Sequence, residues 1–340
     1  MSLLVLKPGP LSLFQDAGRH GYQAYGAPVC GVMDQVAYRL ANALVGNRTP
    51  LPVLEMTLSG PQIKFQQDAC IAVCGAPFSL QCDKRPLAVN RPHLIRAGQV
   101  LDIGAAPMLN GRPQGHARAS LAIAGGVQLT TSMDSASTDI KSRMGGVQGR
   151  ALAKDDRLVL NRQINATAVD ALDNFLDDFR IYLPAGLGLA ARQHIRITRG
   201  AHWTLFDTRQ QDLFLSSTYR ITANSDRMGY RLDGPSLEPE PGLQILSEPT
   251  AFGTIQVPPD GLPIILMADR QTTGGYPKIA NVASVDLPVL ARCLPGERLE
   301  LTLISLDEAH QIFRQREALF APLQQALEPL ATNIAAAFSR

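Results

Sequence analysis

The sequence predicts a mainly β protein built from two related halves. Short apolar runs rich in β-branched residues, separated by Gly and Pro turns, recur along the 340 residues and are typical of sandwiches and barrels. The motif Asp-x3-Tyr-Arg-Leu at residues 34–40 returns at residues 226–232, and Glu-x-Thr-x2-Gly at residues 55–60 returns at residues 248–253. Their shared order and near-equal spacing predict a duplicated β-domain.

The first half contains both strand and helix signals. Strand-like runs lie at residues 53–58, 63–65, 71–74 and 100–103. Asp34 is a suitable N-cap for a helix that we expect to end at Gly46. Asp226 stands at the matching place in the second half, so capping is the expected role for both aspartates.

Domain bounds follow from a change of pattern near Thr167. Apolar residues at helical spacing up to Phe179 predict a short helix with Thr167 as its cap, and strands should resume at Ile181. Ser305 opens a capping box, and Pro322 and Pro329 should break or kink the helix that follows. The predicted parts are a first β-domain at 1–166 with an insertion at about 106–160, a linking helix at 167–179, a second β-domain at 180–305 and a C-terminal helical segment at 306–340.

Composition narrows the class of protein. With 32 basic and 30 acidic side chains the net charge is +2, so we expect no nucleic acid partner. No apolar run approaches the roughly 20 residues that span a bilayer, and the first residues lack a basic leader. We therefore expect a cytoplasmic protein with no membrane association.

The five cysteines are odd in number and scattered, which fits a reducing compartment. Cys70 and Cys74 lie in one strand-like run, where their Cα atoms should be about 13 Å apart. That separation is too large for one zinc ion, and the pair is expected in the core. The six histidines show no metal-ligand spacing, so no metal site is predicted.

A polar loop follows an apolar run in the second half and is the main candidate for a functional site. The strand-like run 264–267 leads into Asp-Arg-Gln-Thr-Thr-Gly-Gly-Tyr-Pro-Lys at residues 269–278. Such a loop at the end of a buried strand can present polar groups to a ligand. The alternative is a solvated turn that needs Gly for positive φ. The first half has no counterpart of this loop.

Two carboxylates interrupt apolar runs and remain ambiguous. Glu55 and Glu248 could be buried acids suited to proton transfer. Their matching positions favour structural carboxylates that accept hydrogen bonds from backbone amides at equivalent turns. No P-loop pattern and no Gly-x-Ser-x-Gly elbow is present in the chain.

Three segments together resemble one protein family. They are Gln-Asp-Ala-Gly-Arg-His-Gly-Tyr at residues 15–22 leading to Gly-Val-Met-Asp at 31–34, Ser-Asp-Arg-Met-Gly-Tyr-Arg-Leu at 225–232, and residues 253–280. They are similar to carboxyltransferase-type proteins, which include the C subunit of the ATP-dependent 5-oxoprolinase, the antagonist of the sporulation-kinase inhibitor, and the carboxyltransferase region of urea carboxylase. The resemblance covers nearly the whole chain and implies tandem cyclophilin-like β-barrels with a few short helices.

The resemblance also implies a function. We expect a subunit of an ATP-dependent 5-oxoprolinase that converts the lactam 5-oxoproline to glutamate, uses ATP with Mg, and acts only with the companion subunits B and A. Biotin-dependent carboxyl transfer to an amide or urea-like nitrogen is the alternative, with biotin as cofactor. A non-enzymatic regulator that binds a partner is a third possibility.

Site roles follow from chemistry and from the matching motifs. Arg270 and Lys278 could offset phosphate or oxyanion charge, and Asp269 could orient Arg270 or hold a metal-nucleotide. These three are the predicted catalytic residues. The predicted substrate-binding or phosphate-binding residues are Gln271, Thr272, Thr273, Gly274, Gly275, Tyr276, Asp226, Arg227, Gln15, Asp16 and Arg19.

Overall fold

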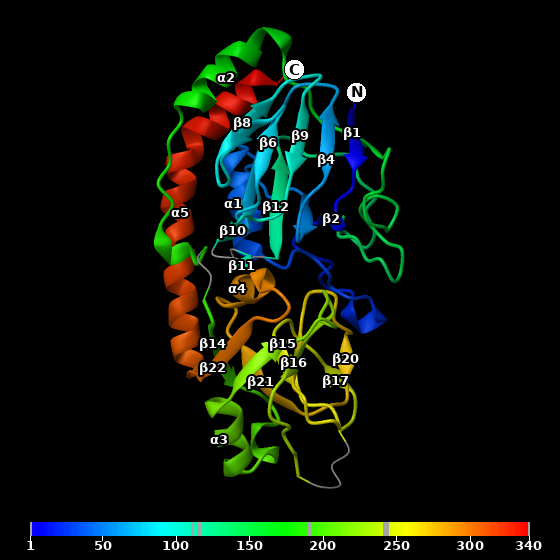
Figure 1. Ribbon diagram of the computed structural model, residues 1–340, viewed down its shortest axis with the longest axis vertical. Coiled ribbons are helices and arrows are strands. Elements are labelled where there is room, and N and C mark those ends of the chain that lie inside the picture. The colour runs from blue at the N-terminus through cyan, green and yellow to red at the C-terminus, as the bar shows by residue number, and fades with distance from the viewer. Residues whose placement is uncertain (1, 110–111, 114–116, 190–191, 241–244, 339–340) are drawn as a thin grey trace. The chain divides into compact units, whose positions relative to one another are not determined.

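The chain forms two compact β units. The computed structural model describes residues 2–109, 112–113, 117–189, 192–240 and 245–338. The first unit comprises Met1–Gly18, Asp34–Leu189 and Leu319–Arg340, and the second comprises Arg19–Met33 and Ala190–Ala318 (Figure 1). The predicted class, mainly β with few helices, is confirmed. The predicted domain bounds stay a prediction, and part of the insertion expected at 106–160 lies outside the described residues.

Two antiparallel sheets make up the first unit. One has the strand order β13-β1-β4-β9-β6-β7 and the other has the order β2-β3-β12-β5-β8. A two-stranded ribbon, β10-β11, is separate from both. The strands are β1 (Ser2–Lys7), β2 (Leu11–Gln15), β3 (Val53–Thr57), β4 (Gln62–Phe65), β5 (Ala69–Gly75), β6 (Leu80–Cys82), β7 (Arg85–Leu87), β8 (Pro92–Ile95), β9 (Val100–Ile103), β10 (Met108–Leu109), β11 (Arg112–Pro113), β12 (Arg118–Ile123) and β13 (Arg157–Val159).

Strand β5 is buried on both faces. Ile71 and Val73 belong to the apolar core that both sheets share. Cys70 and Cys74 alternate with them and are also fully buried, because helix α1 (Gln35–Leu44) packs on β5 and β12. Burial raises the pKa of the Cys70 thiol to about 12. The prediction that both cysteines are core residues is confirmed.

Helix α1 begins as predicted. The Oδ1 atom of Asp34 accepts hydrogen bonds from the backbone amides of Val36, at 3.0 Å, and Ala37, at 2.9 Å. These bonds satisfy two of the amides that a helix N-terminus leaves unpaired. After the last helical turn, Gly46 has φ of 71°, a conformation that favours glycine.

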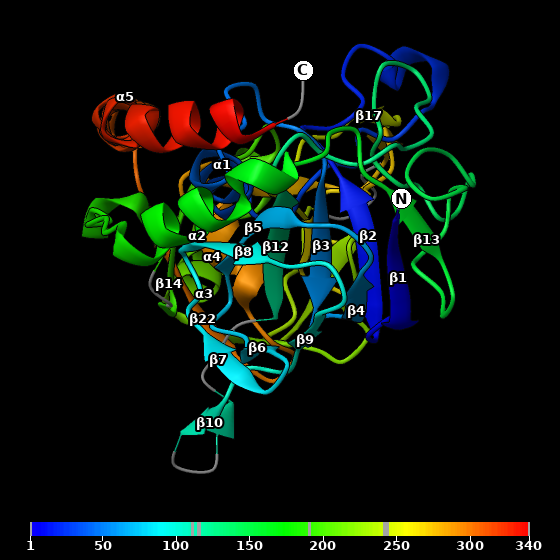
Figure 2. The same cartoon turned by 90° about the horizontal axis from the view of Figure 1, so that it is seen from above.

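Helix α2 (Val169–Asp178) packs against β8, and Figure 2 shows α1 and α2 on the β5–β8 side of the five-stranded sheet, away from β1 and β13. The predicted cap at Thr167 is wrong. The side chain of Asn165 accepts from the Thr167 amide instead and opens a short 3-10 turn, η2 (Ala166–Ala168), ahead of α2. The strand expected at Ile181 begins only at His194, after a second 3-10 turn, η3 (Ala185–Leu187).

Helix α5 (Leu306–Ala337) is longer than the expected short helices, at 32 residues. Ser305 Oγ accepts from the Glu308 amide at 3.1 Å, which confirms the predicted start. Pro322 and Pro329 both lie inside the helix and do not end it. A proline in a helix costs about 3 kcal/mol, and burial of an apolar face around both positions offsets this cost. That face consists of Phe320, Leu323, Leu327, Leu330, Ala331 and Ile334.

The second unit is a closed barrel with the strand order β14-β21-β18-β19-β16-β15-β22. Only β14 and β22 pair in parallel; the other described neighbours in the barrel are antiparallel. Its strands are β14 (His194–Arg199), β15 (Thr218–Ile221), β16 (Gly229–Asp233), β18 (Thr254–Gln256), β19 (Ile264–Leu266), β21 (Lys278–Val282) and β22 (Arg298–Leu303). The remaining elements are η1 (Gln23–Tyr25), η4 (Trp203–Leu205), α3 (Thr208–Ser216), α4 (Leu287–Arg292), and the two-stranded ribbon of β17 (Glu248–Pro249) and β20 (Thr273–Gly274).

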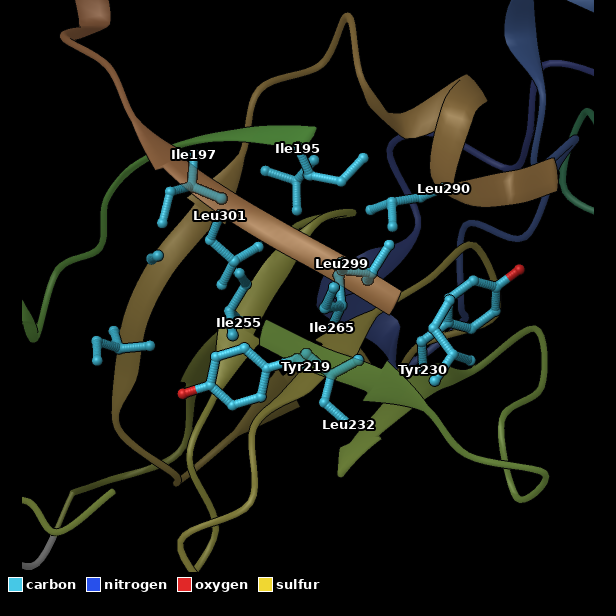
Figure 3. Packing of buried hydrophobic residues seen from close by; sticks show 14 of the residues in the cluster. Ile195, Ile197, Tyr219, Tyr230, Leu232, Ile255, Ile265, Leu290, Leu299 and Leu301 are labelled. Carbon is cyan, nitrogen blue, oxygen red and sulfur yellow. The ribbon is translucent and has the colours of Figure 1, made fainter. Parts of the chain in front are cut away.

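The barrel is filled by apolar side chains from most of its strands. Figure 3 shows Ile255 and Ile265 among aliphatic and aromatic neighbours, and all of the labelled residues are buried. Met33 belongs to the same cluster, which anchors the segment 19–33 to this unit. Close packing therefore makes the barrel wall rigid at β19 and β21. The polar loop at residues 269–278 joins these two strands.

The repeated motifs do not occupy equivalent structures. Residues 34–40 form the cap and first turns of α1, whereas residues 226–232 form a turn and strand β16. The second pair of motifs does begin in strands, at Glu55 in β3 and Glu248 in β17. The predicted equivalence of the two halves is therefore wrong at the first motif, because the same residue pattern forms a helix in the first unit and a barrel strand in the second.

Candidate functional site

The polar loop, residues 269–278, is an ordered ribbon in the second unit. Within it, β20 pairs with β17, so that Gly274 lies opposite Glu248. The Thr250 amide donates to the Thr272 carbonyl at 3.0 Å, and the Thr250 hydroxyl donates to the Gln271 carbonyl. These bonds fix the loop backbone while the side chains of Gln271, Thr273 and Tyr276 remain exposed and that of Thr272 is half-buried.

Asp269 is held by a different arginine from the one expected. Arg227 donates from Nε to Asp269 Oδ2 at 2.9 Å and from Nη2 to Asp269 Oδ1 at 2.8 Å. Arg227 Nη2 also donates to the carbonyl of Gly31 at 2.7 Å. That Asp269 orients Arg270 or holds a metal-nucleotide stays a prediction; the described hydrogen bonds of its carboxylate go to Arg227. This bidentate pair joins the start of the polar loop to the turn before β16 and to the segment 19–33.

Arg270 is a buried cation without such a carboxylate. Its side chain is 8% exposed, and Nη1 makes only a long contact of 3.5 Å with the Met267 carbonyl. Nε has no hydrogen-bond partner among the described residues. Burial lowers the pKa of the guanidinium, and the neighbouring Cys30 and Asp269 partly oppose this effect. A buried charge in such surroundings is costly unless an anion pairs with it.

At the two glycines of the loop, a side chain would crowd neighbouring atoms. Neither Gly274 nor Gly275 has positive φ, so the alternative of a turn that requires it is wrong. A Cβ added at Gly274 would lie 2.7 Å from Nε2 of Gln256, and one at Gly275 would lie 3.0 Å from the Ile245 carbonyl. The fully buried Gln256 also accepts a long contact of 3.5 Å from Gln271 Nε2. The glycines therefore let the ribbon pack directly on a buried amide group.

Lys278, at the end of the loop, belongs to a cluster of three ionisable side chains. Its Nζ donates to Glu248 Oε2 at 2.8 Å, and His202 Nε2 lies 3.7 Å from the same oxygen. The Lys278 amide donates to His202 Nδ1 at 3.0 Å, and the His202 amide donates to the Lys278 carbonyl at 3.0 Å. The Lys278 side chain is 8% exposed, that of His202 is 14% exposed and that of Glu248 is 46% exposed. We call these three residues the His-Glu-Lys cluster.

Electrostatics in the cluster favour an ionised Glu248. The hydrogen bond and the charge of Lys278 hold the pKa of this carboxyl below its usual range, and His202 contributes in the same direction. The sequence interpretation of Glu248 as an amide-bonded acid at a turn is therefore wrong, because its partner is an ammonium group. Glu55, in β3, lies 4.0 Å from Arg118 Nε, and both side chains are buried in the first unit.

Sequence reasoning missed His202 and Gln256 as members of this site. His202 lies 76 positions before Lys278, and no spacing pattern connects them. The one available signal was Gly200, where a Cβ would lie 2.2 Å from the Lys278 carbonyl. The glycine is visible in the sequence, but the close backbone approach that requires it is not.

Asp226 and Asp16 have structural partners. Asp226 Oδ1 accepts from the Met228 amide at 2.7 Å and the Gly229 amide at 3.2 Å, so it caps a turn and not the helix that matching Asp34 implied. Asp16, in the first unit, accepts from Ser135 Oγ at 2.7 Å and from the Ala136 amide at 2.7 Å. It also accepts from the Gly18 amide and from Ser137 Oγ. Its carboxylate thus anchors the insertion.

Gln15 and Arg19 are buried. Gln15, in the first unit, donates from Nε2 to the Thr138 carbonyl at 2.9 Å. Arg19, in the second unit, is fully buried and donates from Nη1 to the Pro28 carbonyl at 3.4 Å. The structure therefore brings Asp269, Arg270, Lys278 and Arg227 together around one loop. Gln15 and Asp16 bond residues of the first unit, and Arg19 bonds Pro28 in the second.

Metal-binding and membrane-spanning features are both absent from the described parts of the chain. No group of three or more His, Cys, Asp or Glu side chains within the described ranges is placed to hold a metal ion. None of the helices that the structure describes is long and apolar enough to cross a bilayer.

Comparison with known proteins identifies the family. Residues 25–303 match the family described as carboxyltransferase domain, subdomain A and B. The chain belongs to this family. The carboxyltransferase-domain match covers the whole polar loop, the turn that holds Arg227 and the His-Glu-Lys cluster.

Two curated relatives match over nearly their full length. The chain is 36% identical to the 5-oxoprolinase C subunit of Haemophilus influenzae over 317 residues, which are 92% of this chain and 95% of the relative. It is 34% identical to the 5-oxoprolinase C subunit of Escherichia coli over 322 residues, which are 94% of this chain and 97% of the relative.

A solved structure of a larger protein is similar to this chain. The crystal structure of the K. lactis urea amidolyase superposes with a TM-score of 0.82 at 29% identity. The match covers 93% of this chain but 19% of that one, so this chain corresponds to about a fifth of the urea amidolyase.

Proposed function

We propose that this chain is a subunit of an ATP-dependent 5-oxoprolinase, which converts 5-oxoproline, ATP and water to glutamate, ADP and phosphate. The names of the two relatives aligned over nearly their full length support this assignment. The structural observation that carries it is Arg270, a buried guanidinium whose neighbouring carboxylate is already bound by Arg227. A site with an uncompensated buried cation is suited to a phosphate or an oxyanion.

The chemistry requires such a group. A five-membered lactam is a resonance-stabilised amide, and phosphorylation of its oxygen makes the carbon electrophilic. When bound, ATP with Mg²⁺ supplies the phosphoryl group. This chain contributes the Arg270 guanidinium and the Lys278 ammonium, which stabilise negative charge on the oxygen atoms that surround the reacting carbon. Because Arg227 binds both oxygens of Asp269, we propose that this carboxylate supports the loop.

The chain is proposed to act in a complex. Two relatives aligned over nearly their full length are each named as one subunit of the enzyme, which supports companion subunits. We propose the companion subunits B and A as its partners in the cytoplasm.

Biotin-dependent carboxyl transfer is the second candidate, to which the carboxyltransferase-domain match and the similarity to the urea amidolyase give weaker support. Product analysis of the reconstituted complex separates the candidates. Glutamate release that requires ATP and 5-oxoproline supports the proposal. A requirement for bicarbonate and biotin supports carboxyl transfer, and absence of turnover with either set of substrates leaves a regulator that acts by binding.

A further inference from the structure

The His-Glu-Lys cluster presents two groups that the proposed role of Arg270 does not use. Nε2 of His202 lies 3.7 Å from Glu248 Oε2, too far for a hydrogen bond, and it has no other partner among the described residues. Oε2 of Glu248 accepts one hydrogen bond, from Lys278, and its second lone pair can accept another. A donor and an acceptor therefore stand side by side at a position where Glu248 is about half exposed.

The donor character of His202 is fixed by the backbone. The Lys278 amide is a donor only, and it points at Nδ1 at 3.0 Å. Nδ1 therefore carries no proton, and the neutral ring carries its proton on Nε2. The bond from the His202 amide to the Lys278 carbonyl and the close approach of Gly200 to Lys278 hold the backbone of His202 next to this amide.

The acceptor character of Glu248 is fixed by Lys278. The ammonium lies 2.8 Å from Oε2 and lowers the pKa of the carboxyl, so Glu248 is an ionised acceptor at neutral pH. The pairing of β17 with β20 holds its backbone against the polar loop.

We infer that His202 and Glu248 recognise the cis-amide edge of a lactam or a cyclic ureide, with His202 Nε2 donating to the carbonyl oxygen and Glu248 accepting from the ring N–H. A ring amide is locked in the cis form, so its oxygen and its N–H lie on one edge. Two atoms 3.7 Å apart can each reach one of these neighbouring groups at about 2.9 Å. The inference rests on the proposed function where it names 5-oxoproline as the lactam.

Ligands that lack one of the two groups should be rejected. A lactone keeps the carbonyl but replaces N–H with an ether oxygen, which faces the carboxylate as a second acceptor. An N-methyl lactam places a methyl group there. A site built to hydrogen-bond a ligand group discriminates strongly against analogues without it, because its own polar atoms are left unpaired.

The test is calorimetric binding to the purified chain and to the assembled complex. The probes are 5-oxoproline, its N-methyl derivative and its γ-lactone analogue, with 2-imidazolidinone and biotin as the ureide arm. We expect 5-oxoproline to bind at least about tenfold more tightly than the N-methyl and lactone analogues. Tighter binding of the ureides than of 5-oxoproline would show that His202 and Glu248 recognise the same edge in a biotin-type ring.

Variants separate the donor from the acceptor. In His202→Asn the Asn oxygen can still accept from the Lys278 amide, but the Nε2 donor is lost, so 5-oxoproline should bind about tenfold more weakly. His202→Gln places an amide N–H near the Nε2 position and should restore part of the affinity. Glu248→Gln directs its oxygen to Lys278 and its NH₂ outward, so the preference for the lactam over the lactone should disappear. His310→Asn, an exposed position in α5, is the matched control.

Wild-type affinity and discrimination in both His202→Asn and Glu248→Gln overturn the inference, as does the absence of measurable lactam binding by the wild-type chain and complex. If both variants bind like the wild type and the complex still opens 5-oxoproline with ATP, the inference fails and the proposed function stands. If discriminating lactam binding depends on both residues but the complex never opens the lactam, the proposed function fails instead.

Discussion

At the scale of residues, arginines of the second unit differ in how their charge is balanced. Arg227 forms a bidentate pair with Asp269, and Arg196 contacts Asp286 at 2.6 Å. Arg270 lies beside Asp269 in sequence, yet within the described residues the one hydrogen bond of its side chain is the 3.5 Å contact with a carbonyl. Arg227 and Arg196 are paired with acids, whereas Arg270 has no such hydrogen bond to a described residue, and this difference supports the proposed anion site.

Replacement of Arg270 with Lys tests this role. The charge is kept, but the planar fork that binds two oxygen atoms is lost. We expect Arg270→Lys to fold and assemble but to lose at least about tenfold in turnover, or roughly 1.4 kcal/mol of transition-state stabilisation. Steady-state kinetics of the complex measure this, with the exposed Arg298→Lys as control. Full turnover in Arg270→Lys places the anion site elsewhere.

Asp269→Asn should lower the free energy of unfolding of the chain. The substitution removes the carboxylate from Arg227, which is 5% exposed, while the bond from its Nη2 to the Gly31 carbonyl is kept. Loss of one partner of a buried pair typically costs about 3–5 kcal/mol, and the partial exposure of Asp269 reduces this to about 2 kcal/mol. Chemical denaturation of the isolated chain measures the change. An unchanged unfolding midpoint would show that the pair is not a support of the loop.

The pH dependence of Glu248 follows from its partner. Lys278 lowers the pKa of this carboxyl, so the stabilisation from the ion pair is present above the usual pKa of a glutamate. It is lost as the pH falls through the lowered value. We expect NMR titration to place Glu248 below the usual glutamate range, and Lys278→Met to raise its pKa towards that range. Identical titration curves in the two proteins contradict the pairing.

At the scale of elements, the site depends on the close approach between the residue that follows β14 and the start of β21. After β14, Gly200 passes against the Lys278 carbonyl and the Ala280 amide, where a Cβ would lie 2.2 Å and 2.7 Å from these backbone atoms. Backbone atoms cannot move aside as a side chain can. The same approach places His202 within hydrogen-bonding distance of Lys278. One glycine therefore connects barrel packing to the geometry of the His-Glu-Lys cluster.

Gly200→Ala is expected to destabilise the chain by about 2 kcal/mol, the middle of the range for overpacked sites. It should also change the NMR signals of the His202 ring, because the bond to the Lys278 amide is displaced. Thermal unfolding and ring NMR spectra measure the two effects, with Ala201→Ser at the next, exposed position as control. A stable Gly200→Ala chain with unchanged ring signals shows that the approach is not restrictive.

At the scale of the whole molecule, the candidate site contains only part of what the proposed reaction needs. The polar loop provides the cations Arg270 and Lys278, and the sequence contains no P-loop pattern or nucleophile elbow. The relatives that match at full length are named as one subunit of an enzyme. The site is therefore expected to work with groups from companion subunits.

The purified chain alone should be nearly inert. We expect ATP-dependent release of glutamate from 5-oxoproline only after the companion subunits are added, with the rate of the lone chain at background. A coupled assay for ADP together with glutamate analysis measures both conditions. Robust turnover by the lone chain would contradict the division of labour among subunits.

The sequence by itself determined the features that depend on neighbours along the chain. The run at 100–103 became β9, Asp34 became the cap of α1, and the change from an apolar strand to the polar loop located the candidate site. Alternation, capping and turn chemistry act over a few residues, so they can be read locally.

Only the tertiary structure decided which groups face each other. Asp269 pairs with Arg227, 42 positions away, and not with the adjacent Arg270. Glu248 and His202 reach Lys278 from 30 and 76 positions away. The motif at residues 226–232 became a strand although its letters match a helix at residues 34–40. Closure of the barrel buries the second copy of the motif between β15 and β19, and the free energy of this long-range packing exceeds the small differences in local propensity that favour one element over the other.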